Sequence, residues 1–300
     1  MKQFSELKDK KYASDFLATH LVDGSLVLFL GAGTSKGFGL PNWEELVNKL
    51  RIKVGLLTLV DVVSAEDLQR GADEVSDLLD EKAQLISYIK EILYPNQSYI
   101  DVKQVYSNPL LTSISSLLMG SKRGHVKIVV TFNYDSMLEW YLSLFGFMVK
   151  SISSLPTLEG SEDVRIYHPH GFVPHLSLGL EDSSFVIIGL NDANKRLGNS
   201  GDPWFEKLRS IFESSLCLFI GLSDLTLSDR AIAPLLSTCG EKVKNIRPLG
   251  IWISKDIVTE RKESEFFRNN IVPLHIPDPI DISDFLLSIS QSAMKKVNFL

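Results

Sequence analysis

Four short segments of this sequence combine glycines with polar residues, and each could carry chemistry at the end of a strand. They are Gly31-Ala32-Gly33-Thr34-Ser35, Thr131-Phe132-Asn133-Tyr134-Asp135, His168-Pro169-His170-Gly171 and Gly221-Leu222-Ser223-Asp224. The first, second and fourth directly follow continuous apolar runs. Because ligands of open α/β sheets collect beyond the carboxyl ends of the strands, we expect these segments to border one site.

The first segment has the composition of a phosphate-binding loop. Glycines let the backbone turn sharply and come close to a ligand, and unpaired N–H groups near the start of a helix favour a diphosphate. The helix is expected to begin near residues 42–45, where Asn42 can cap it and Glu45 stands at the reciprocal position of a capping box. A tight turn from strand to helix, without any ligand, is the alternative explanation of the same spacing.

The glycine spacing departs from two nucleotide-binding patterns. A dinucleotide fingerprint has its third glycine where this sequence has Lys36, and its acidic ribose anchor where this sequence has Arg51. A Walker-type loop ends in Gly-Lys-Ser or Gly-Lys-Thr, and no such ending follows Gly33. These departures argue against an ordinary dehydrogenase and against Walker-type phosphate binding.

The other segments offer side chains for polar and acid–base chemistry. Asn133 and Asp135 are placed to reach a crevice beyond a strand, although both residue types also serve as helix N-caps. His170, before a glycine at the expected end of a strand, is suited to proton transfer near neutral pH, while His168 is expected to have a supporting role. Neither histidine has a cysteine cluster or an HExxH pattern beside it, so metal ligation is disfavoured. Gly221 offers a second point of close approach, or simply a turn.

The apolar patterns around these segments predict an α/β fold with a Rossmann-like parallel sheet and helices on both faces. Apolar runs of strand length stand at residues 25–30, 126–130, 185–188, 216–220 and 249–253. Helices are expected over residues 4–21, 136–144, 204–213 and 284–295. Residues 52–122 contain no convincing buried strand, which predicts a helical insertion within a single domain of residues 1–300.

Length and composition limit the classes of protein that fit. With 300 residues, 44% of them apolar, the chain can bury a sizeable core, and a disordered protein is excluded. The formal net charge of −6 gives no basic surface for nucleic acid, which we therefore do not expect as a partner. The two cysteines rule out a disulfide framework and a four-cysteine zinc site. Because the sequence shows neither a signal-peptide core nor an apolar run of membrane-spanning length, we expect a cytoplasmic protein without a membrane partner.

In order, the four segments resemble the motif series of the sirtuin family, with Gly39-Leu40-Pro41-Asn42-Trp43 following the glycine loop. The chain is most similar to the bacterial sirtuin-like branch found in anti-phage defence, whose members degrade NAD. The resemblance implies that Asn133 orients a ribose hydroxyl or the attacking water, and that His170 is the general base. It further implies NAD-binding residues in the glycine loop, beside the nicotinamide carboxamide and near the ribose and phosphates: Gly31, Ala32, Gly33, Thr34, Ser35, Asp135, Gly221 and Ser223.

Departures from the protein-deacylating sirtuins bear on the reaction. Those enzymes have a zinc module built from two CxxC pairs, which this sequence lacks, and Phe132 stands where they have glutamine. We therefore expect NAD to be the substrate of a hydrolase that releases nicotinamide and ADP-ribose, with no zinc. The alternatives are a regulatory module that binds NAD or ADP-ribose, and a deacylase without zinc. The resemblance also implies a homo-oligomer or a partner such as a HerA-type ATPase, because an unregulated NADase would harm its host.

Overall fold

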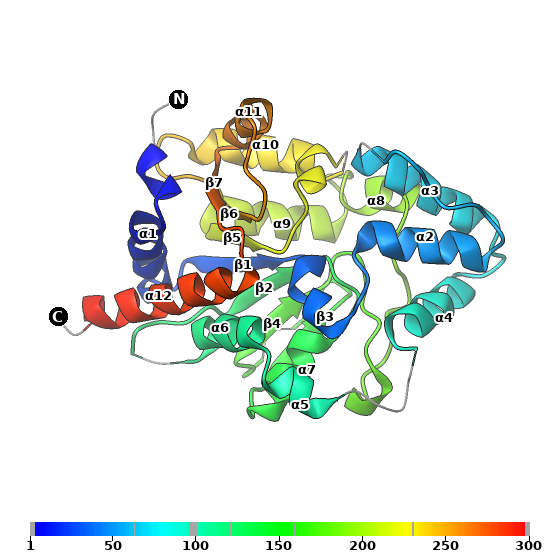
Figure 1. Ribbon diagram of the computed structural model, residues 1–300, viewed down its shortest axis with the longest axis horizontal. Coiled ribbons are helices and arrows are strands. Elements are labelled where there is room, and N and C mark those ends of the chain that lie inside the picture. Colours follow the sequence, from blue (N-terminus) through cyan, green and yellow to red (C-terminus); the bar gives the residue numbers. More distant parts are fainter. Residues whose placement is uncertain are drawn as a thin grey trace.

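The centre of the molecule is a seven-stranded sheet in the order β3-β4-β2-β1-β5-β6-β7, in which every neighbouring pair is parallel (Figure 1). The computed structural model describes residues 4–62, 64–95, 101–120, 122–158, 160–229 and 231–297. The strands are β1 (Leu26–Leu30), β2 (Ile128–Thr131), β3 (Val149–Ile152), β4 (Val164–Tyr167), β5 (Leu216–Ile220), β6 (Gly250–Ser254) and β7 (Ile271–His275). The predicted parallel sheet is therefore confirmed.

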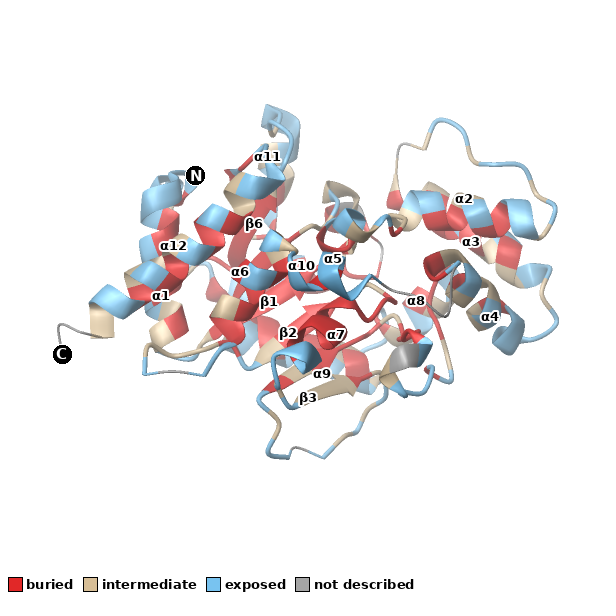
Figure 2. Ribbon diagram, turned by 60° about the horizontal axis from the view of Figure 1, so that its bottom comes forward, coloured by how far each residue is buried: buried red, intermediate tan, exposed pale blue. Residues whose placement is uncertain are grey.

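β1 lies in the middle of the sheet and is buried along its whole length. Its side chains alternate between two hydrophobic cores. Leu26, Leu28 and Leu30 belong to the larger core, and Val27 and Phe29 belong to the smaller one. Because a strand has a two-residue period, burial on both faces requires the continuous apolar run seen in the sequence. Figure 2 shows these buried strands between helices whose outer sides are exposed.

Two layers of helices cover the sheet and confirm the predicted Rossmann-like arrangement. The larger core receives side chains from α1 (Lys10–Val22), α2 (Trp43–Lys53), α3 (Ala65–Asp77), α4 (Lys82–Leu93), α5 (Val102–Tyr106), α6 (Pro109–Leu118), α7 (Met137–Leu144) and α12 (Pro279–Val297). The smaller core receives them from α8 (Leu190–Arg196), α9 (Pro203–Ser214), α10 (Ala233–Val243) and α11 (Glu260–Arg268). Short 3-10 helices are η1 (Ser5–Lys8), η2 (Ala32–Thr34), η3 (Lys36–Phe38), η4 (Leu176–Leu178) and η5 (Asp224–Ser228).

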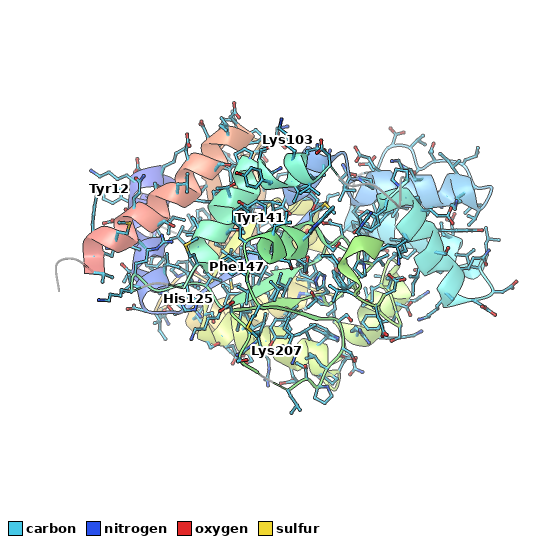
Figure 3. The ribbon with its side chains drawn as sticks, turned by 90° about the horizontal axis from the view of Figure 1, so that it is seen from below. Tyr12, Lys103, His125, Tyr141, Phe147 and Lys207 are labelled. Atoms are coloured by element: carbon cyan, nitrogen blue, oxygen red, sulfur yellow. The ribbon has the colours of Figure 1, made fainter. Side chains whose placement is uncertain are left out.

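The predicted helical stretch at residues 52–122 contains α3 to α6, and no strand occurs among the residues described there. The stretch divides into two groups. α3 and α4 lie beside α2 at one end of the molecule, while α6 packs against α12 (Figure 1). Tyr141 of α7, labelled in Figure 3, donates from its hydroxyl to Thr112 Oγ1 of α6 at 2.9 Å. The two groups therefore lie in different parts of the molecule.

The prediction of a strand at residues 185–188 is wrong. The segment is largely buried, but it joins no ladder of the sheet. Its backbone instead meets the loop after β4, where Ile187 N donates to His170 O at 2.8 Å. A short apolar run shows that a segment is buried and does not show which backbone groups it pairs with.

The apolar runs also missed β4, which was expected only from a strand end near His170, and they missed β3 and β7, which form the two edges of the sheet. β3 carries Lys150 and Ser151 at partly exposed positions, so it shows no continuous apolar run. β7 contains Pro273, which lacks the N–H that a central strand needs and is tolerated at an edge. Edge strands are less buried or less regular than central ones, and their sequence signal is correspondingly weaker.

The helices follow their sequence signals more closely. Those expected at residues 136–144, 204–213 and 284–295 are α7, α9 and α12. At α2 the predicted capping box is present, since Asn42 Oδ1 accepts from Glu45 N at 2.8 Å and Glu45 Oε2 accepts from Asn42 N at 2.7 Å. The first helix is shorter than expected, because Asp9 caps α1 after a separate η1. No helix in the described ranges is both long and apolar enough to cross a membrane.

Candidate functional site

The chemistry-bearing segments meet at the carboxyl ends of the central strands, where they border a cavity of about 460 Å³. This is the edge at which parallel α/β sheets collect their ligands. Of the predicted site residues, those that line the cavity are Gly31, Ala32, Gly33, Asn133, Asp135, His170, Gly221 and Ser223. Thr34 and Ser35 are not part of its lining.

The glycine loop after β1 packs backbone to backbone against the loop after β5. Gly31 N donates to Ile220 O at 3.0 Å, and Gly33 N donates to Gly221 O at 2.8 Å. A Cβ atom on Gly33 would lie 2.7 Å from the Cα of Gly221, and one on Gly31 would lie 2.6 Å from Gly221 O. Since no side chain fits at such distances, the contact between the two loops is by itself a sufficient reason for these glycines. The tight turn, which the sequence left open as an alternative to a phosphate-binding loop, is therefore present.

The glycine loop offers one backbone N–H to a ligand. The N–H groups of Gly31 and Gly33 donate to β5 and the loop after it. Those of Thr34 and Ser35 donate to carbonyl groups within the loop. Ala32 N has no partner among the described residues, and Ala32 lines the cavity. A ligand oxygen at this position would complete the hydrogen bonding of the loop.

The hydroxyl groups of Thr34 and Ser35 form contacts within the protein. Thr34 Oγ1 donates to Gly31 O at 2.7 Å, and Ser35 Oγ donates to Asp135 Oδ1 at 3.0 Å. Both residues are buried and border a separate void of about 10 Å³, which is roughly the room of one water molecule. Ser35 therefore contacts Asp135, another predicted site residue, and does not line the cavity.

Asn133 joins the end of β2 to the glycine loop. Its Nδ2 lies 3.1 Å from Gly31 O, 3.3 Å from Thr34 Oγ1 and 3.3 Å from Ser35 Oγ. An amide NH₂ group has two hydrogens, so these three acceptors share them. No donor among the described residues reaches Asn133 Oδ1. The amide nitrogen is thus committed to the protein, and the amide oxygen is left for a ligand.

Asp135 is buried between the cavity and the first turn of α7. Its Oδ1 accepts from Ser35 Oγ at 3.0 Å and from Met137 N, the first residue of α7, at 3.1 Å, although the N-cap position of α7 is Ser136 and not Asp135. Burial raises the pKa of this carboxyl to about 6, and the two hydrogen bonds act against that rise. The group therefore titrates close to neutral pH.

His170 presents an imidazole without a hydrogen-bond partner on Nε2, which is shielded from solvent. Its ring packs against Phe132 at 4.8 Å between ring centroids. Burial lowers the pKa of His170 to about 4, and the positive charge of Arg196 adds to that effect. Arg196 itself stacks over the ring of Phe185, 3.3 Å from the centroid. At neutral pH His170 is uncharged and has a free ring nitrogen.

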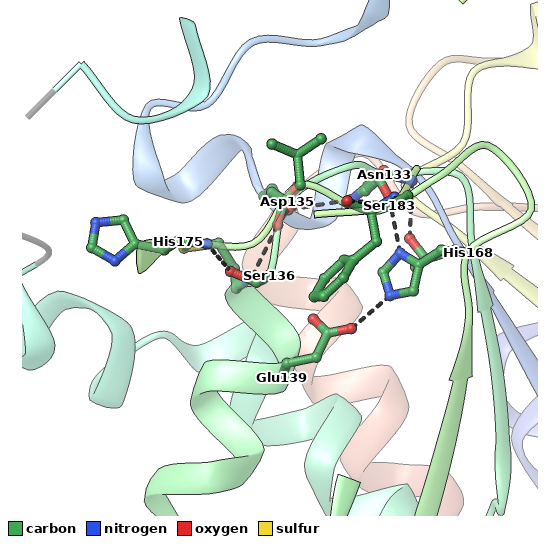
Figure 4. A network of polar contacts seen from close by, with 12 residues as sticks. Asn133, Asp135, Ser136, Glu139, His168, His175 and Ser183 are labelled. Atoms are coloured by element: carbon green, nitrogen blue, oxygen red, sulfur yellow. Dashed lines mark hydrogen bonds and ion pairs between the residues drawn. The ribbon is translucent and has the colours of Figure 1, made fainter. Parts of the chain in front are cut away.

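His168 is only two residues from His170, but both of its ring nitrogens have hydrogen-bond partners within the protein. It is fully buried and does not line the cavity. Its Nε2 lies 2.7 Å from Glu139 Oε1, and its Nδ1 lies 3.2 Å from Asn133 O (Figure 4). The two histidines are thus different in kind, since one borders the cavity and the other braces the loop that carries Asn133.

Gly221 and Ser223 form the turn after β5. Gly221 has a φ of +68°, the left-handed region that favours glycine, and the adjoining glycine loop leaves no room for a side chain. Ser223 is the N-cap of η5, and its Oγ accepts from Leu225 N at 3.3 Å. Both residues line the cavity, so the predicted second point of close approach lies beside the first.

Sequence reasoning missed a buried polar pair in the cavity wall. Gln69 of α3 and Asp229, which follows η5, are only 2% and 6% exposed. Gln69 Nε2 donates to Asp229 Oδ2 at 2.9 Å, and Asp229 Oδ1 accepts from the N–H groups of Ala231 and Ile232. Gln69 Oε1 is buried without a partner. No local motif marks these residues, because 160 positions separate them and only the fold brings them together.

The described residues contain no group of three or more His, Cys, Asp or Glu side chains that could hold a metal ion. The two cysteines, Cys217 on β5 and Cys239 on α10, are buried in the smaller core. Burial raises the pKa of both thiols, as expected of cysteines packed in an apolar core.

Comparison with known proteins adds a family to this geometry. No curated protein matches the chain. Residues 127–274, just under half of the 300, match the model of the SIR2-like domain. The matched range contains Asn133, Asp135, His170 and the turn after β5, and it ends within β7. Members of the SIR2-like family are NAD-dependent enzymes. Together with the Rossmann-like sheet, this match identifies a SIR2-like domain at residues 127–274 and supports a sirtuin-like family for the chain.

Proposed function

We propose that this protein is an NAD⁺ glycohydrolase, which cleaves the bond between nicotinamide and ribose. The observation that carries the proposal is the convergence of Asn133, Asp135 and His170 with the glycine loop on one cavity. These residues come from three separate segments of the chain. A cavity of about 460 Å³ is in the range of ordinary small-molecule sites.

Several features of the cavity fit the groups of NAD. Ala32 N is available for a diphosphate oxygen, and the turn at Gly221 and Ser223 borders the same region. Asp135 uses Oδ1 for its contacts with the protein, so that Oδ2 is available to accept from the amino group of the nicotinamide carboxamide. Phe132 and Leu222 provide apolar surface for the rings. These assignments agree with the roles that the sirtuin resemblance implies.

The proposed reaction needs a proton acceptor more than a proton donor. When the glycosidic C–N bond breaks, its electron pair returns to the pyridinium nitrogen and nicotinamide leaves as a neutral molecule. Water then forms a new C–O bond to the ribose carbon and gives up one proton. His170, neutral above its lowered pKa of about 4, takes that proton on Nε2, directly or through a ribose hydroxyl. The products are nicotinamide, ADP-ribose and a proton.

The polar groups around His170 would favour the positive charge that develops on the ribose. Asp135 supplies a carboxylate, and Asn133 supplies an amide oxygen whose orientation is fixed by the bonds of its nitrogen. Fixed dipoles of this kind do not need to reorganise during the reaction, which makes them effective in a cavity sheltered from water. Asn133 Oδ1 is also suited to orient the attacking water.

One observation favours a second candidate, a regulatory module that binds NAD or ADP-ribose without cleaving it. A pKa of about 4 makes unliganded His170 a weak base. A binding module would need the same cavity and no base at all. Turnover separates the two functions directly.

We further propose that the NADase is an effector of anti-phage defence, restrained until a partner or self-assembly activates it. The support is the sirtuin-like motif series and the harm that constant NAD loss would cause. A homo-oligomer, in which the helices of residues 52–122 contribute to assembly or to closure of the cavity, is the simplest form. A HerA-type ATPase is a candidate partner. A monodisperse monomer with full activity in light scattering would contradict the proposed role of assembly.

The test of the proposed function is product analysis with purified protein, in each oligomeric state and with its physiological activator. We expect nicotinamide and ADP-ribose in equal amounts from NAD without any peptide. Binding of NAD in calorimetry without turnover would support the regulatory module. Formation of O-acyl-ADP-ribose from an acylated peptide would instead indicate a deacylase, and either result would overturn the proposal.

A further inference from the structure

His168 directly follows β4 and is fully buried, so its imidazole does not line the cavity. Both ring nitrogens nevertheless have partners. Nε2 lies 2.7 Å from Glu139 Oε1 on α7, and Nδ1 lies 3.2 Å from the backbone oxygen of Asn133. Phe172 packs against the ring at 4.3 Å between centroids. The imidazole is therefore a buried bridge between α7 and the segment that carries Asn133, as Figure 4 shows.

The two partners determine where the hydrogens of this bridge lie. A backbone carbonyl only accepts, so Nδ1 of His168 must carry the hydrogen that faces Asn133 O. Nε2 and Glu139 Oε1 lie 2.7 Å apart, so a second hydrogen lies between these two atoms on one or the other of them. The donor toward Asn133 is thus present in either case.

Asn133 depends on this donor because it lies in a segment without helix or strand. Residues 132–136 join β2 to α7 without regular secondary structure, although Phe132 N still donates to Leu30 O at 3.2 Å and Tyr134 O accepts from Val173 N at 2.8 Å. Asn133 N donates to Thr131 Oγ1 at 3.1 Å, and its side chain reaches Gly31 O at 3.1 Å. No donor other than His168 reaches Asn133 O among the described residues. Loss of this donor would leave the partly buried carbonyl of Asn133 unpaired and release one of the three points that hold Asn133.

We propose that His168, which is supported by its contact with Glu139, is a positioning residue for Asn133. His168 fixes the backbone carbonyl, the glycine loop fixes the amide nitrogen, and the amide oxygen is thereby held toward the cavity. The effect on catalysis rests on the proposed function, whereas the contact between His168 and Asn133 does not. If the pair only stabilised the fold, the contact with Glu139 would matter and the contact with Asn133 would not.

Two substitutions at one position separate these roles. In His168→Asn the amide nitrogen replaces Nδ1, which keeps the donor toward Asn133 O and gives up the contact with Glu139. In His168→Gln the amide nitrogen replaces Nε2, which keeps the contact with Glu139 and gives up the donor toward Asn133. Glu139→Gln is the matched variant that leaves Nδ1–H in place. Ile289→Val, in the larger core and outside the cavity lining, controls for a general loss of stability.

We expect His168→Gln to lose more activity than His168→Asn, and His168→Asn to lose more stability than His168→Gln. His168→Gln should lose about 30-fold or more in kcat with KM changed by less than about 3-fold, because Asn133 acts mainly on the transition state. His168→Asn should lose less than about 5-fold in kcat, yet unfold at a lower temperature than His168→Gln, because Glu139 is left buried and unpaired. A larger loss of kcat in His168→Asn than in His168→Gln, with both folded, would overturn the proposal.

A second measurement does not depend on turnover. Asn133-Tyr134 is the only Asn-Tyr pair in the sequence, so protein labelled with ¹³C′-asparagine and ¹⁵N-tyrosine gives one peak in an HNCO spectrum. Because a hydrogen bond deshields a carbonyl carbon, this peak should move upfield in ¹³C in His168→Gln and stay near its wild-type position in His168→Asn and Glu139→Gln. An unmoved peak in folded His168→Gln would refute the positioning role, whether or not the protein cleaves NAD.

If His168→Gln does not fold, the wild-type protein still provides a test. Among its six histidines, ¹⁵N-histidine labelling should show that the ring whose signals are absent from His168→Asn carries a hydrogen on Nδ1. An unprotonated Nδ1 in that ring would contradict the proposal. Absence of nicotinamide release from the wild type would count against the proposed function alone.

Discussion

The two sides of the cavity are built differently. On the sheet side, the loops after β1 and β5 touch backbone to backbone, and hydrogen bonds join Asn133, Ser35 and Asp135. On the helical side, Gln69 and Asp229 link α3 to the segment after η5, and Gln69 Oε1 is buried without a partner. A buried acceptor without a donor costs about 1–3 kcal/mol, so a water molecule or a ligand that donates to it would be favoured.

This difference indicates which parts of the site are fixed before a ligand arrives. The sheet side carries the residues proposed for the reaction, and hydrogen bonds within the protein hold Asn133 and Asp135 while leaving Asn133 Oδ1 and His170 Nε2 available to a ligand. On the helical side, the described polar contacts are the hydrogen bonds that join Gln69, Asp229 and the backbone after it, and we expect this side to adjust more readily. Sites commonly combine a rigid constellation with a less stable wall in this way. The following predictions test the comparison in order of expected effect.

The largest effect is expected from the proposed catalytic pair on the sheet side. Asn133→Ala and His170→Ala should each reduce nicotinamide release by about 10²–10⁴-fold, because general acid–base and electrostatic effects of that size are lost. The double variant should be scarcely worse than the worse single variant, since both act on one transition state. His275→Ala, on an exposed strand end away from the cavity, is the matched histidine control and should keep full activity. Robust turnover by folded His170→Ala would remove it from the role of base.

The contact between the loops should be the next most sensitive feature. Gly221→Ala places a Cβ atom 2.8 Å from Thr34 N at a φ of +68°, whereas Gly39→Ala has a φ of +75° and nothing within 4 Å. The left-handed backbone costs each variant about 1–2 kcal/mol, and crowding adds about 1–3 kcal/mol at Gly221 alone. Chemical denaturation measures the difference. Equal losses in the two variants would show that the loops do not pack as tightly as described.

The pH dependence of stability should reveal opposite contributions from the two titrating groups on the sheet side. Asp135 has a pKa of about 6 in the folded state and an ordinary value of 3.8, so it takes up a proton earlier when folded and adds stability as pH falls from 6 to 4. His170 has a pKa of about 4 when folded and an ordinary value of 6.5, so it loses stability as pH falls from 6.5 to 4. Each effect amounts to roughly 3 kcal/mol, and in the wild type they largely cancel.

Removing one group at a time should therefore expose the other. Asp135→Asn is expected to lose stability on acidification from pH 7 to pH 4.5 more steeply than the wild type, and His170→Asn less steeply. Denaturation midpoints at the two pH values provide the measurement. Identical acid sensitivity in all three proteins would mean that the two groups are less buried than the structure indicates.

The smallest effect is expected on the helical side. Gln69→Met removes the unpaired Oε1 but also takes the side-chain donor from Asp229 Oδ2, so the two contributions act against each other and the free energy of unfolding should change by less than about 2 kcal/mol. Leu68→Ala, a truncation of the buried neighbour on α3, provides a variant that must cost more, about 2–5 kcal/mol. If Gln69→Met destabilised the protein as strongly as Gly221→Ala, the helical side would be no looser than the sheet side.

The sequence by itself determined the layered fold and the edge of the sheet at which the site lies. Continuous apolar runs at β1, β2, β5 and β6 reflect burial on both faces, and the capping box at Asn42 is a local pattern of neighbouring residues. Glycines and polar residues directly after such runs mark strand ends, which is sufficient to name the motif residues. These signals are local, because period and chain order alone produce them.

Only the tertiary structure determines which partners each of those residues contacts. Ser35 turns to Asp135 and away from the cavity, His168 and His170 enter different environments two residues apart, and Gln69 meets Asp229 across 160 positions. The segment at residues 185–188 is a further example. Its apolar run indicated burial, but its backbone pairs with the loop after β4 and not with a strand. Burial follows from residue type, whereas the choice of hydrogen-bond partner depends on which distant segments the packed core brings within about 3 Å.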